Sequence, residues 1–212
     1  MPDDRDARQH RRARRCGQTT VIDLVGHHLR ALGHLVHTTT EPSRGPIGQL
    51  ARSHADVLHG YALASLVAAD RYHHLDAELR PRRDSGHIVL CDRYLPSTLV
   101  LQRIDGVRLD FLEAVNAHVD LPDLAVLLTV APRVAATRVH ARGGAHSRFH
   151  QGPSSTAQEI VCYEQTATWL TDRRVPVLRV DTTTSSPNEV ATTITEGIVA
   201  MLSTERVNPH PR

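Results

Sequence analysis

Short apolar segments alternate with longer segments of helical periodicity along most of the chain, and this alternation constrains the fold more than any other feature. The strongest apolar segment is 124–130, whose continuous apolar character is typical of a parallel strand buried on both faces. Further strands are expected at 35–38, 87–91 and 175–180, and helices at 19–33, 47–58, 61–80, 109–119, 132–142, 156–173 and 187–202. This order predicts an α/β fold, a parallel sheet with helices on both faces.

Length and composition exclude several classes of protein. A chain of 212 residues is expected to form one domain. No apolar run approaches the ~18 residues of a membrane span, and the N-terminus has no apolar signal region, so neither a membrane protein nor a secreted one is expected. Cys16, Cys91 and Cys162 are too far apart for a disulfide framework or a C-x-x-C metal site, which suits a reducing cytoplasm.

The charged residues are unevenly distributed. All 25 basic residues are Arg, and six of them fall within residues 1–15 beside three Asp, so the rest of the chain is nearly neutral. We expect a polar, Arg-rich tail at 1–15 that is disordered or misread, one domain at 16–203 and a C-terminal tail at 204–212. The basic tail has no interleaved aromatic residues, so nucleic acid is not expected as a partner.

Polar side chains follow three of the expected strands. Thr40 and Glu41 follow one strand, Asp92 and Arg93 a second, and Asp181 a third. Ligands of parallel α/β sheets bind beyond the carboxyl ends of the strands. The guanidinium of Arg93 could there hold a phosphate through two parallel hydrogen bonds. The alternative is an ion pair with Asp92 or a plain surface position.

Several motifs occur in a fixed order. They are Thr39-Thr-Glu-Pro-Ser-Arg-Gly-Pro-Ile-Gly48, Ala68-Ala-Asp-Arg71, Ile88-Val-Leu-Cys-Asp-Arg-Tyr94 with Ser97 and Gln102, and Leu121-Pro-Asp-Leu124 followed by Arg138 to Arg142 and Ser147-Arg148-Phe149. In order and spacing, over about residues 16–200, these segments resemble the motifs of thymidylate kinases. The chain resembles a bacterial, actinomycete-like member of that family.

The resemblance implies a P-loop kinase fold, a three-layer α/β/α sandwich with a small arginine-bearing lid. It also implies ATP-dependent phosphorylation of dTMP to dTDP, with ATP and Mg²⁺ as cofactors, in a cytoplasmic homodimer. Two alternatives remain open: a non-catalytic nucleotide-binding protein that keeps the dTMP pocket, and a kinase for another nucleotide. The 15 histidines are scattered without metal-ligand spacing, so no metal site is expected from them.

The resemblance also assigns residues to the acceptor dTMP. Arg93 would bind its 5′-phosphate, and Arg71 would reach the thymine carbonyl unless it is a surface Arg paired with Asp70. Val67 stands where the family has a Phe stacked on the base, so base preference is left open. The full set of substrate residues is Glu41, Val67, Arg71, Arg93, Thr98 and Gln102.

Catalysis and ATP binding are assigned in the same way. Arg142 and Arg148 flank Gly143 and Gly144, which give a lid hinge freedom, and the lid would place positive charge over the transferred phosphate. Solvated loop arginines are the alternative. Asp92 is the third catalytic residue, Thr19 and Asp92 are the Mg²⁺ ligands, and the ATP-binding residues are Gly17, Gln18, Thr19, Thr20 and Asp181.

The N-terminal region departs from the family pattern. Gln18 stands in place of the phosphate-loop Lys, Arg12 in place of its first Gly, and the chain has no Lys that could substitute. Residues 6–11 contain one apolar side chain in six, which does not suit the central strand that should precede the loop. Two explanations compete: a misread start or frame, and a decayed kinase.

Overall fold

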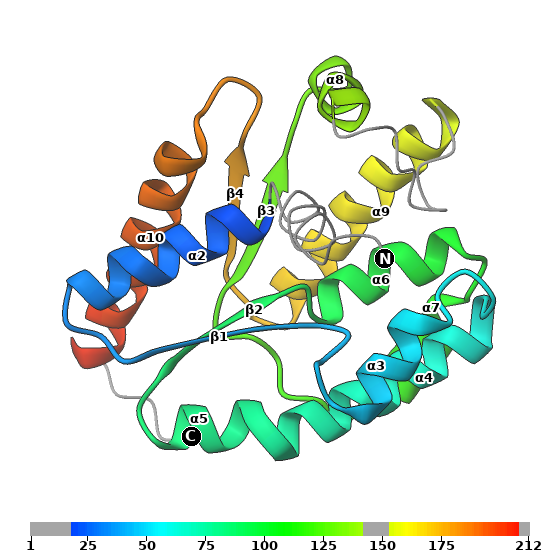
Figure 1. The fold of residues 1–212 in the computed structure, drawn as a ribbon, viewed down its shortest axis with the longest axis horizontal. Coiled ribbons are helices and arrows are strands. Elements are labelled where there is room, and N and C mark those ends of the chain that lie inside the picture. The colour runs from blue at the N-terminus through cyan, green and yellow to red at the C-terminus, as the bar shows by residue number, and fades with distance from the viewer. Residues whose placement is uncertain (1–17, 142–152, 208–212) are drawn as a thin grey trace, which may run out of the picture.

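The computed structural model describes residues 18–141 and 153–207. Figure 1 shows helices packed around short parallel strands. The elements, in chain order, are α2 (Gln18–Ala31), β1 (Val36–Thr40), α3 (Pro46–Ser53), α4 (Gly60–His74), the π-helix η1 (Leu75–Leu79), α5 (Arg80–Asp84), β2 (Ile88–Asp92), α6 (Leu95–Ile104), α7 (Leu109–Val115), β3 (Ala125–Thr129), α8 (Pro132–Ala141), α9 (Pro153–Asp172), β4 (Val177–Asp181) and α10 (Pro187–Val207).

The strands pair in parallel, as predicted, but in two separate sheets. β1 pairs with β2 in the register Val36 to Ile88, and β3 pairs with β4 in the register Ala125 to Val177. Within the described residues, no hydrogen bonds join β2 to β3, so the predicted single sheet is not seen there. The α/β architecture with parallel strands is confirmed, and the facing edges of β2 and β3 are left apart.

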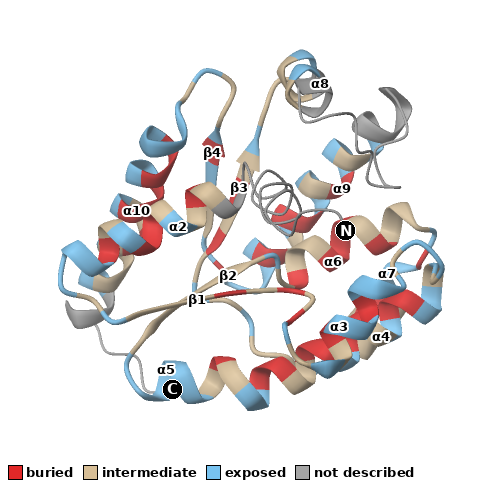
Figure 2. Ribbon diagram, viewed as in Figure 1, coloured by how far each residue is buried: buried red, intermediate tan, exposed pale blue. Residues whose placement is uncertain are grey.

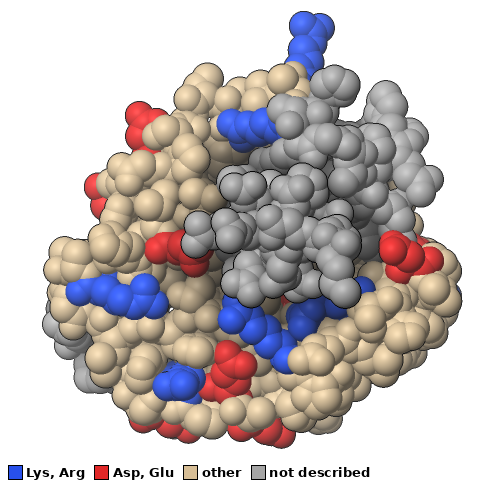
Figure 3. Space-filling view, in the orientation of Figure 1, with Lys and Arg blue, Asp and Glu red and all other residues tan. Residues whose placement is uncertain are grey.

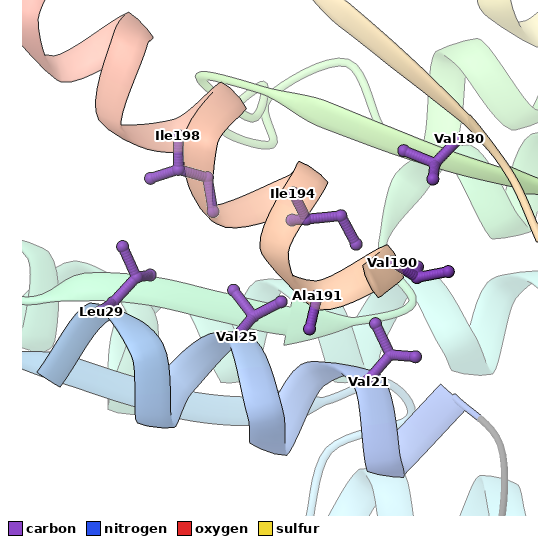
Figure 4. Packing of buried hydrophobic residues seen from close by; sticks show 8 residues of the cluster. All are labelled: Val21, Val25, Leu29, Val180, Val190, Ala191, Ile194 and Ile198. Carbon is purple, nitrogen blue, oxygen red and sulfur yellow. The ribbon is translucent and has the colours of Figure 1, made fainter. Parts of the chain in front are cut away.

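Helices cover both faces of the strands. α2 and α10 pack on each other and on the strands, and Figure 4 shows Val21, Val25 and Leu29 of α2 pointing toward Ala191, Ile194 and Ile198 of α10. The opposite face carries α4, α6 and α9, where Leu170 of α9 packs on Ala125 of β3. Buried residues line the inward sides of these helices (Figure 2). The predicted layers are therefore present.

Several helix boundaries differ from the predictions, and α10 extends to Val207, five residues beyond its predicted end at 202. α3 ends at Ser53, five residues before the predicted end, and Val57, which was expected within this helix, is 70% exposed. α7 ends at Val115, before Asn116, whose side chain returns to the Leu112 carbonyl.

Two further differences, the extension of the helix after Gly60 and the unpredicted helix α6, both involve a proline. The helix that begins at Gly60 continues past Pro81 to Asp84, and the wider π-turn Leu75–Leu79 lies just before this proline, which lacks a helical N–H. α6, which was not predicted, has its proline in the first turn, where a missing N–H costs nothing.

Several predicted segments lie outside the described residues. They include the tail at 1–15, the lid residues from Arg142 to Arg148, and residues 208–212 of the C-terminal tail. In the part of the chain that is described, none of the helices combines the length and apolar character needed to cross a membrane.

Acidic and basic side chains are interspersed on the face shown in Figure 3.

Candidate functional site

The ends of β1 and β2 bring predicted site residues to one place. Thr40 is in register with Asp92, and the Thr40 hydroxyl donates to the Asp92 carbonyl at 2.9 Å. The Glu41 N–H donates to the same carbonyl at 3.0 Å and continues the ladder by one residue. Glu41, Asp92 and Arg93 therefore share one edge of this sheet, as the position of the strand ends predicts.

Arg71 lies at the centre of the site and is 1% exposed, so it is not the surface Arg of the alternative interpretation. Its Nε donates to Glu41 at 2.8 Å, its Nη1 to the Asn116 side chain at 2.5 Å and its Nη2 to the Thr98 hydroxyl at 2.8 Å. The guanidinium also lies 5.3 Å from the centre of the Tyr94 ring. A buried arginine is thus fixed by partners from three other segments: the loop after β1, the start of α6 and the end of α7.

Asp70, the alternative partner of Arg71, has a different role. It is buried, and its two carboxylate oxygens accept from the backbone N–H of Ser43 at 2.5 Å and the Ser43 hydroxyl at 2.6 Å. The loop after β1 is further fixed at Gly48, because a Cβ there would lie 2.1 Å from the Ser43 carbonyl oxygen. Asp70 therefore fixes the loop that carries Glu41, and Arg71 pairs with Glu41 instead of Asp70.

Asp92 and Arg93 differ sharply in environment. Burial raises the pKa of the Asp92 carboxyl, and the neighbouring charge of Arg93 only partly opposes that rise. Arg93 is exposed, its φ of 69° is in the left-handed region, and its guanidinium has no hydrogen-bond or ion-pair partner among the described residues. The predicted alternative, an Asp92–Arg93 ion pair, is not formed. Among the described residues, the end of β2 thus carries a cation without an ion-pair partner.

The remaining substrate residues come from two helices. Val67 of α4 is buried, and Thr98 and Gln102 of α6 are 3% and 5% exposed. Thr98 contacts Arg71 directly. The side-chain oxygen of Gln102 is buried and has no hydrogen-bond partner among the described residues, which is unusual for a buried polar atom.

Two residues of this cluster were not predicted. Asn116 accepts from Arg71, and His74 lies between the Thr39 hydroxyl at 2.9 Å and the Glu41 carboxylate at 3.4 Å. Both are buried. Asn116 lies beyond the end of α7, where no sequence pattern distinguishes it. His74 lies one helical turn after Arg71, and this spacing on an inward-facing helix was the available signal.

The residues predicted for ATP lie at the end of the other sheet. The Asp181 carboxylate accepts from the N–H and hydroxyl of Thr183, and the hydroxyl bond lowers the pKa of Asp181 most. Arg138 donates to the Thr182 carbonyl at 2.7 Å. Asp181 is therefore engaged in its own loop and makes no described contact with the Arg71 cluster.

Other predicted residues are described in part or not at all. Gln18, Thr19 and Thr20 form the first turn of α2, and Thr20 is half-buried. Gly17, Arg142 and Arg148 lie outside the described residues. The phosphate-loop and lid assignments therefore stay predictions.

The sequence is similar to a family of known proteins. A protein-family model described as thymidylate kinase matches residues 14–194. A probable thymidylate kinase of Pyrobaculum aerophilum is 40% identical over 134 residues, 61% of this chain and 67% of that protein. One from Caldivirga maquilingensis is 39% identical over 132 residues, 60% of this chain and 64% of that protein.

A thymidylate kinase of Xanthomonas oryzae is 36% identical over 135 residues, 63% of this chain and 60% of that protein. The matched segments thus span 60% to 67% of the length of these relatives. The family model covers most of the chain and includes every described residue of the Arg71 cluster. This chain belongs to the thymidylate kinase family.

Proposed function

We propose that this chain binds dTMP and belongs to an enzyme that phosphorylates dTMP to dTDP with ATP. The observation that carries the proposal is the buried Arg71 cluster, together with Arg93 at the end of β2, which has no charge partner among the described residues. A buried arginine held by Glu41, Thr98 and Asn116 is preorganised to recognise a polar group, and a free arginine nearby suits a phosphate. Family membership supports this choice of ligand.

The thymine base has two carbonyl oxygens and one N–H that need partners. Nε and Nη2 of Arg71 both lie 2.8 Å from Glu41 Oε2, and two further N–H groups donate to Asn116 and Thr98, so one donor remains for a carbonyl. The unpartnered oxygen of Gln102 can accept from an N–H. We therefore assign base recognition to Arg71 and Gln102, with Val67 providing apolar contact.

The acceptor phosphate is assigned to Arg93. Its guanidinium is exposed and has no described partner, so binding a phosphate there breaks no existing ion pair. A charge-assisted bidentate contact would fix the orientation of the phosphate as well as its position. We propose that this contact aligns the acceptor for in-line transfer from ATP.

The residues present also fit Mg²⁺. This ion is commonly held by one or two carboxylates together with phosphates, so a single half-buried carboxylate, Asp92, is sufficient on the protein side. We assign the ion to Asp92 and the hydroxyl of Thr19. When bound, Mg²⁺ would supply positive charge to the phosphate oxygens during transfer.

Turnover by this chain should nevertheless be near background. Gln18 is neutral and the chain has no Lys, so one preorganised cation is missing from the phosphate loop. Removal of one preorganised donor typically costs about 10²–10³ in rate. We expect dTMP binding to persist while phosphoryl transfer is very slow.

A coupled assay of dTDP formation tests the function. The full chain is compared with a variant in which residues 1–18 are replaced by an apolar strand and a glycine-rich loop that ends in Lys. Restored turnover with dTMP, in preference to dUMP, dCMP and dGMP, is the expected result. Binding of dTMP without turnover in either protein would favour the non-catalytic alternative, and preference for another nucleotide would change the substrate. Rapid dTDP formation by the unaltered chain would refute the reasoning about Gln18.

We also propose a homodimer in the cytoplasm, by resemblance to the family. The widely spaced cysteines support a reducing compartment. Sedimentation equilibrium at several protein concentrations tests the dimer, and a monomeric mass at all concentrations would contradict it.

A further inference from the structure

β1 lies alongside the helix that runs from α4 into η1 (Figure 1), and a row of polar side chains joins the two. Its members alternate along β1 and the residue after it, and they are three and four residues apart on the helix, so each set shares one face. They are His37, Thr39 and Glu41 on the strand side and Arg71, His74 and Glu78 on the helix side. The proposed dTMP site uses only the Arg71 and Glu41 end of this row.

Burial increases along the row toward that end. The side chains of His37 and Glu78 are 21% and 34% exposed, whereas those of His74 and Arg71 are 1% exposed. At the outer end, Nε2 of His37 donates to the Glu78 carboxylate at 2.7 Å. The row therefore leads from the surface to the buried arginine, and His74 lies between the two ends.

Both ring nitrogens of His74 face oxygen atoms. Nδ1 lies 3.4 Å from Oε1 of Glu41, and Nε2 lies 2.9 Å from the Thr39 hydroxyl and 3.5 Å from Oε2 of Glu78. An ionised carboxylate only accepts hydrogen bonds, so a ring nitrogen that bonds to one must carry a hydrogen atom. Nδ1 of His74 is therefore assigned as a donor to Glu41.

The Thr39 hydroxyl fixes the state of the other ring nitrogen. Burial raises the pKa of Glu78, but hydrogen bonds from the His37 and Thr39 side chains, together with nearby charge, outweigh burial and lower it. The hydroxyl has a single hydrogen, which it donates to Glu78, so its oxygen accepts from Nε2 of His74. Nε2 must then carry a hydrogen atom as well.

With hydrogens on both ring nitrogens, His74 is a cation between the carboxylates of Glu41 and Glu78. A neutral ring would take the Thr39 hydrogen at Nε2, and Glu78 would then face a lone pair at 3.5 Å without its hydroxyl donor. Loss of a donor to a partly buried carboxylate is unfavourable. The charged ring satisfies every oxygen in this part of the row.

Further titratable groups come from the same helix and from β2. Arg71, one turn before His74, is a cation, but the Glu41 carboxylate lies 2.8 Å from it and balances its charge. Cys91 of β2 is the register partner of Thr39, and burial raises the pKa of its thiol well above the usual value, so the thiol stays uncharged. The two carboxylates are therefore the dominant charges that act on His74.

The contact between His74 and Glu41 bears on how Arg71 is held. Oε2 of Glu41 accepts from both Nε and Nη2 of Arg71, and Oε1 is left for Nδ1 of His74. With a partner on each oxygen, the plane of the carboxylate is fixed, and the guanidinium that bonds to it is fixed as well. The remaining N–H of Arg71, on Nη1, then has a set direction.

We propose that His74 is a positioning residue for base recognition, a cation held between Glu41 and Glu78 that orients Arg71 through the Glu41 carboxylate. It acts without touching the substrate, as partners that orient binding groups commonly do. The inference rests on the proposed dTMP site for the identity of the ligand. The charge of His74 and its effect on Arg71 can be measured without any ligand.

Nitrogen-15 NMR of the ligand-free full chain at pH 7 is the first test. The His74 signals are assigned by their loss in His74→Gln, and both ring nitrogens should carry hydrogen in the parent. In the same variant, the Nε–H signal of Arg71 should shift and exchange faster with water. Glu78→Gln removes one carboxylate, so one ring nitrogen of His74 should lose its hydrogen. Asp76→Asn is the matched control, because Asp76 is on the same π-turn but is 71% exposed and pairs with Arg80, and it should keep the parent signals.

Titration calorimetry with dTMP is the second test. His74→Gln should weaken dTMP binding by roughly 10- to 100-fold, the range for loss of one charge-assisted hydrogen bond. Glu78→Gln, at a half-exposed position where folding is safe, should weaken it in the same direction but less, and Asp76→Asn should not change it. The comparator is 2-deoxyribose 5-phosphate, which has the phosphate but no base, and its binding should be equal in all four proteins.

Three results would overturn the proposal. The first is a ring nitrogen of His74 without hydrogen in the parent at pH 7. The second is unchanged dTMP affinity in His74→Gln. The third is an equal loss of affinity for dTMP and for 2-deoxyribose 5-phosphate, which would mean that His74 only supports the fold. Failure of the parent to bind dTMP would refute the proposed function instead, and the Nε–H signal of Arg71 would then decide, because an unchanged signal in His74→Gln would exclude positioning by His74.

Discussion

Arg71→Met should destabilise this protein far more than an ordinary substitution of a charged residue. Arg71 is 1% exposed, and its guanidinium binds Glu41, Thr98 and Asn116. Methionine keeps much of the apolar length of the side chain but removes the charge and all donors. The Glu41 carboxylate, which is 4% exposed, would then remain buried without its cation.

The magnitude follows from that burial. Breaking a buried ion pair by removing one partner typically costs about 3–5 kcal/mol, because an uncompensated charge is left inside. For a chain of this length, 1 kcal/mol corresponds to roughly 2–4 °C in melting temperature, so the variant should melt roughly 6–20 °C below the parent. Urea unfolding followed by circular dichroism provides the free energy of unfolding.

The double variant Glu41→Gln with Arg71→Met is the control. It removes both charges, so it should be more stable than the sum of the single variants predicts, with a coupling of about 0.5–3 kcal/mol. A loss below ~1 kcal/mol in Arg71→Met, or additive effects within ~0.5 kcal/mol, would refute the buried ion pair as described.

Three further predictions concern residues around the site. Gly48→Ala should cost on the order of 1–3 kcal/mol in urea unfolding, because its Cβ would stand 2.1 Å from the Ser43 carbonyl oxygen, and an unchanged midpoint would contradict that contact. Asp92→Asn should melt higher than the parent at pH 7, because burial raises the pKa of Asp92 and disfavours its charged form in the folded protein. This difference in melting temperature should vanish as the pH falls below 3.8, the ordinary pKa of Asp, and a lower melting temperature of the variant at pH 7 would be inconsistent with this reasoning. Asp120→Asn should melt lower than the parent at pH 7, because hydrogen bonding from Arg80 lowers the pKa of Asp120 and so stabilises the folded protein. This stabilisation is lost as the pH falls through the lowered pKa, so melting temperatures of parent and variant that fail to converge in acid would argue against it.

The strands were predictable because their apolar character is strong and local. Each of the four predicted strands is present within about two residues of its expected bounds, and 124–130 contains β3. α6 was missed although Leu95 and Leu99 have helical spacing and Pro96 is a typical first-turn residue. The separation of β2 from β3 is a tertiary property, since it depends on what occupies the space between two edges.

The site was predictable in part. Glu41, Arg71, Thr98 and Gln102 were assigned by resemblance; the structure brings the first three into direct contact, and Gln102 is buried one turn after Thr98 on α6. Asn116 could not be assigned from sequence, because its contact with Arg71 depends on how α7 ends beside α4. Local patterns specify which helix face is buried, whereas the partner across a helix interface is set by packing.

Titration calorimetry with dTMP and thymidine, on the parent chain and on Arg93→Ala, tests the central claim that an acceptor site for dTMP is built here. The parent should bind one dTMP per chain, and Arg93→Ala should weaken dTMP binding by about 1.5–3 kcal/mol, the contribution of a charge-assisted hydrogen bond. Thymidine, which lacks the phosphate, should bind both proteins equally. No binding of dTMP to the parent, or equal affinity for dTMP in Arg93→Ala, would contradict the account.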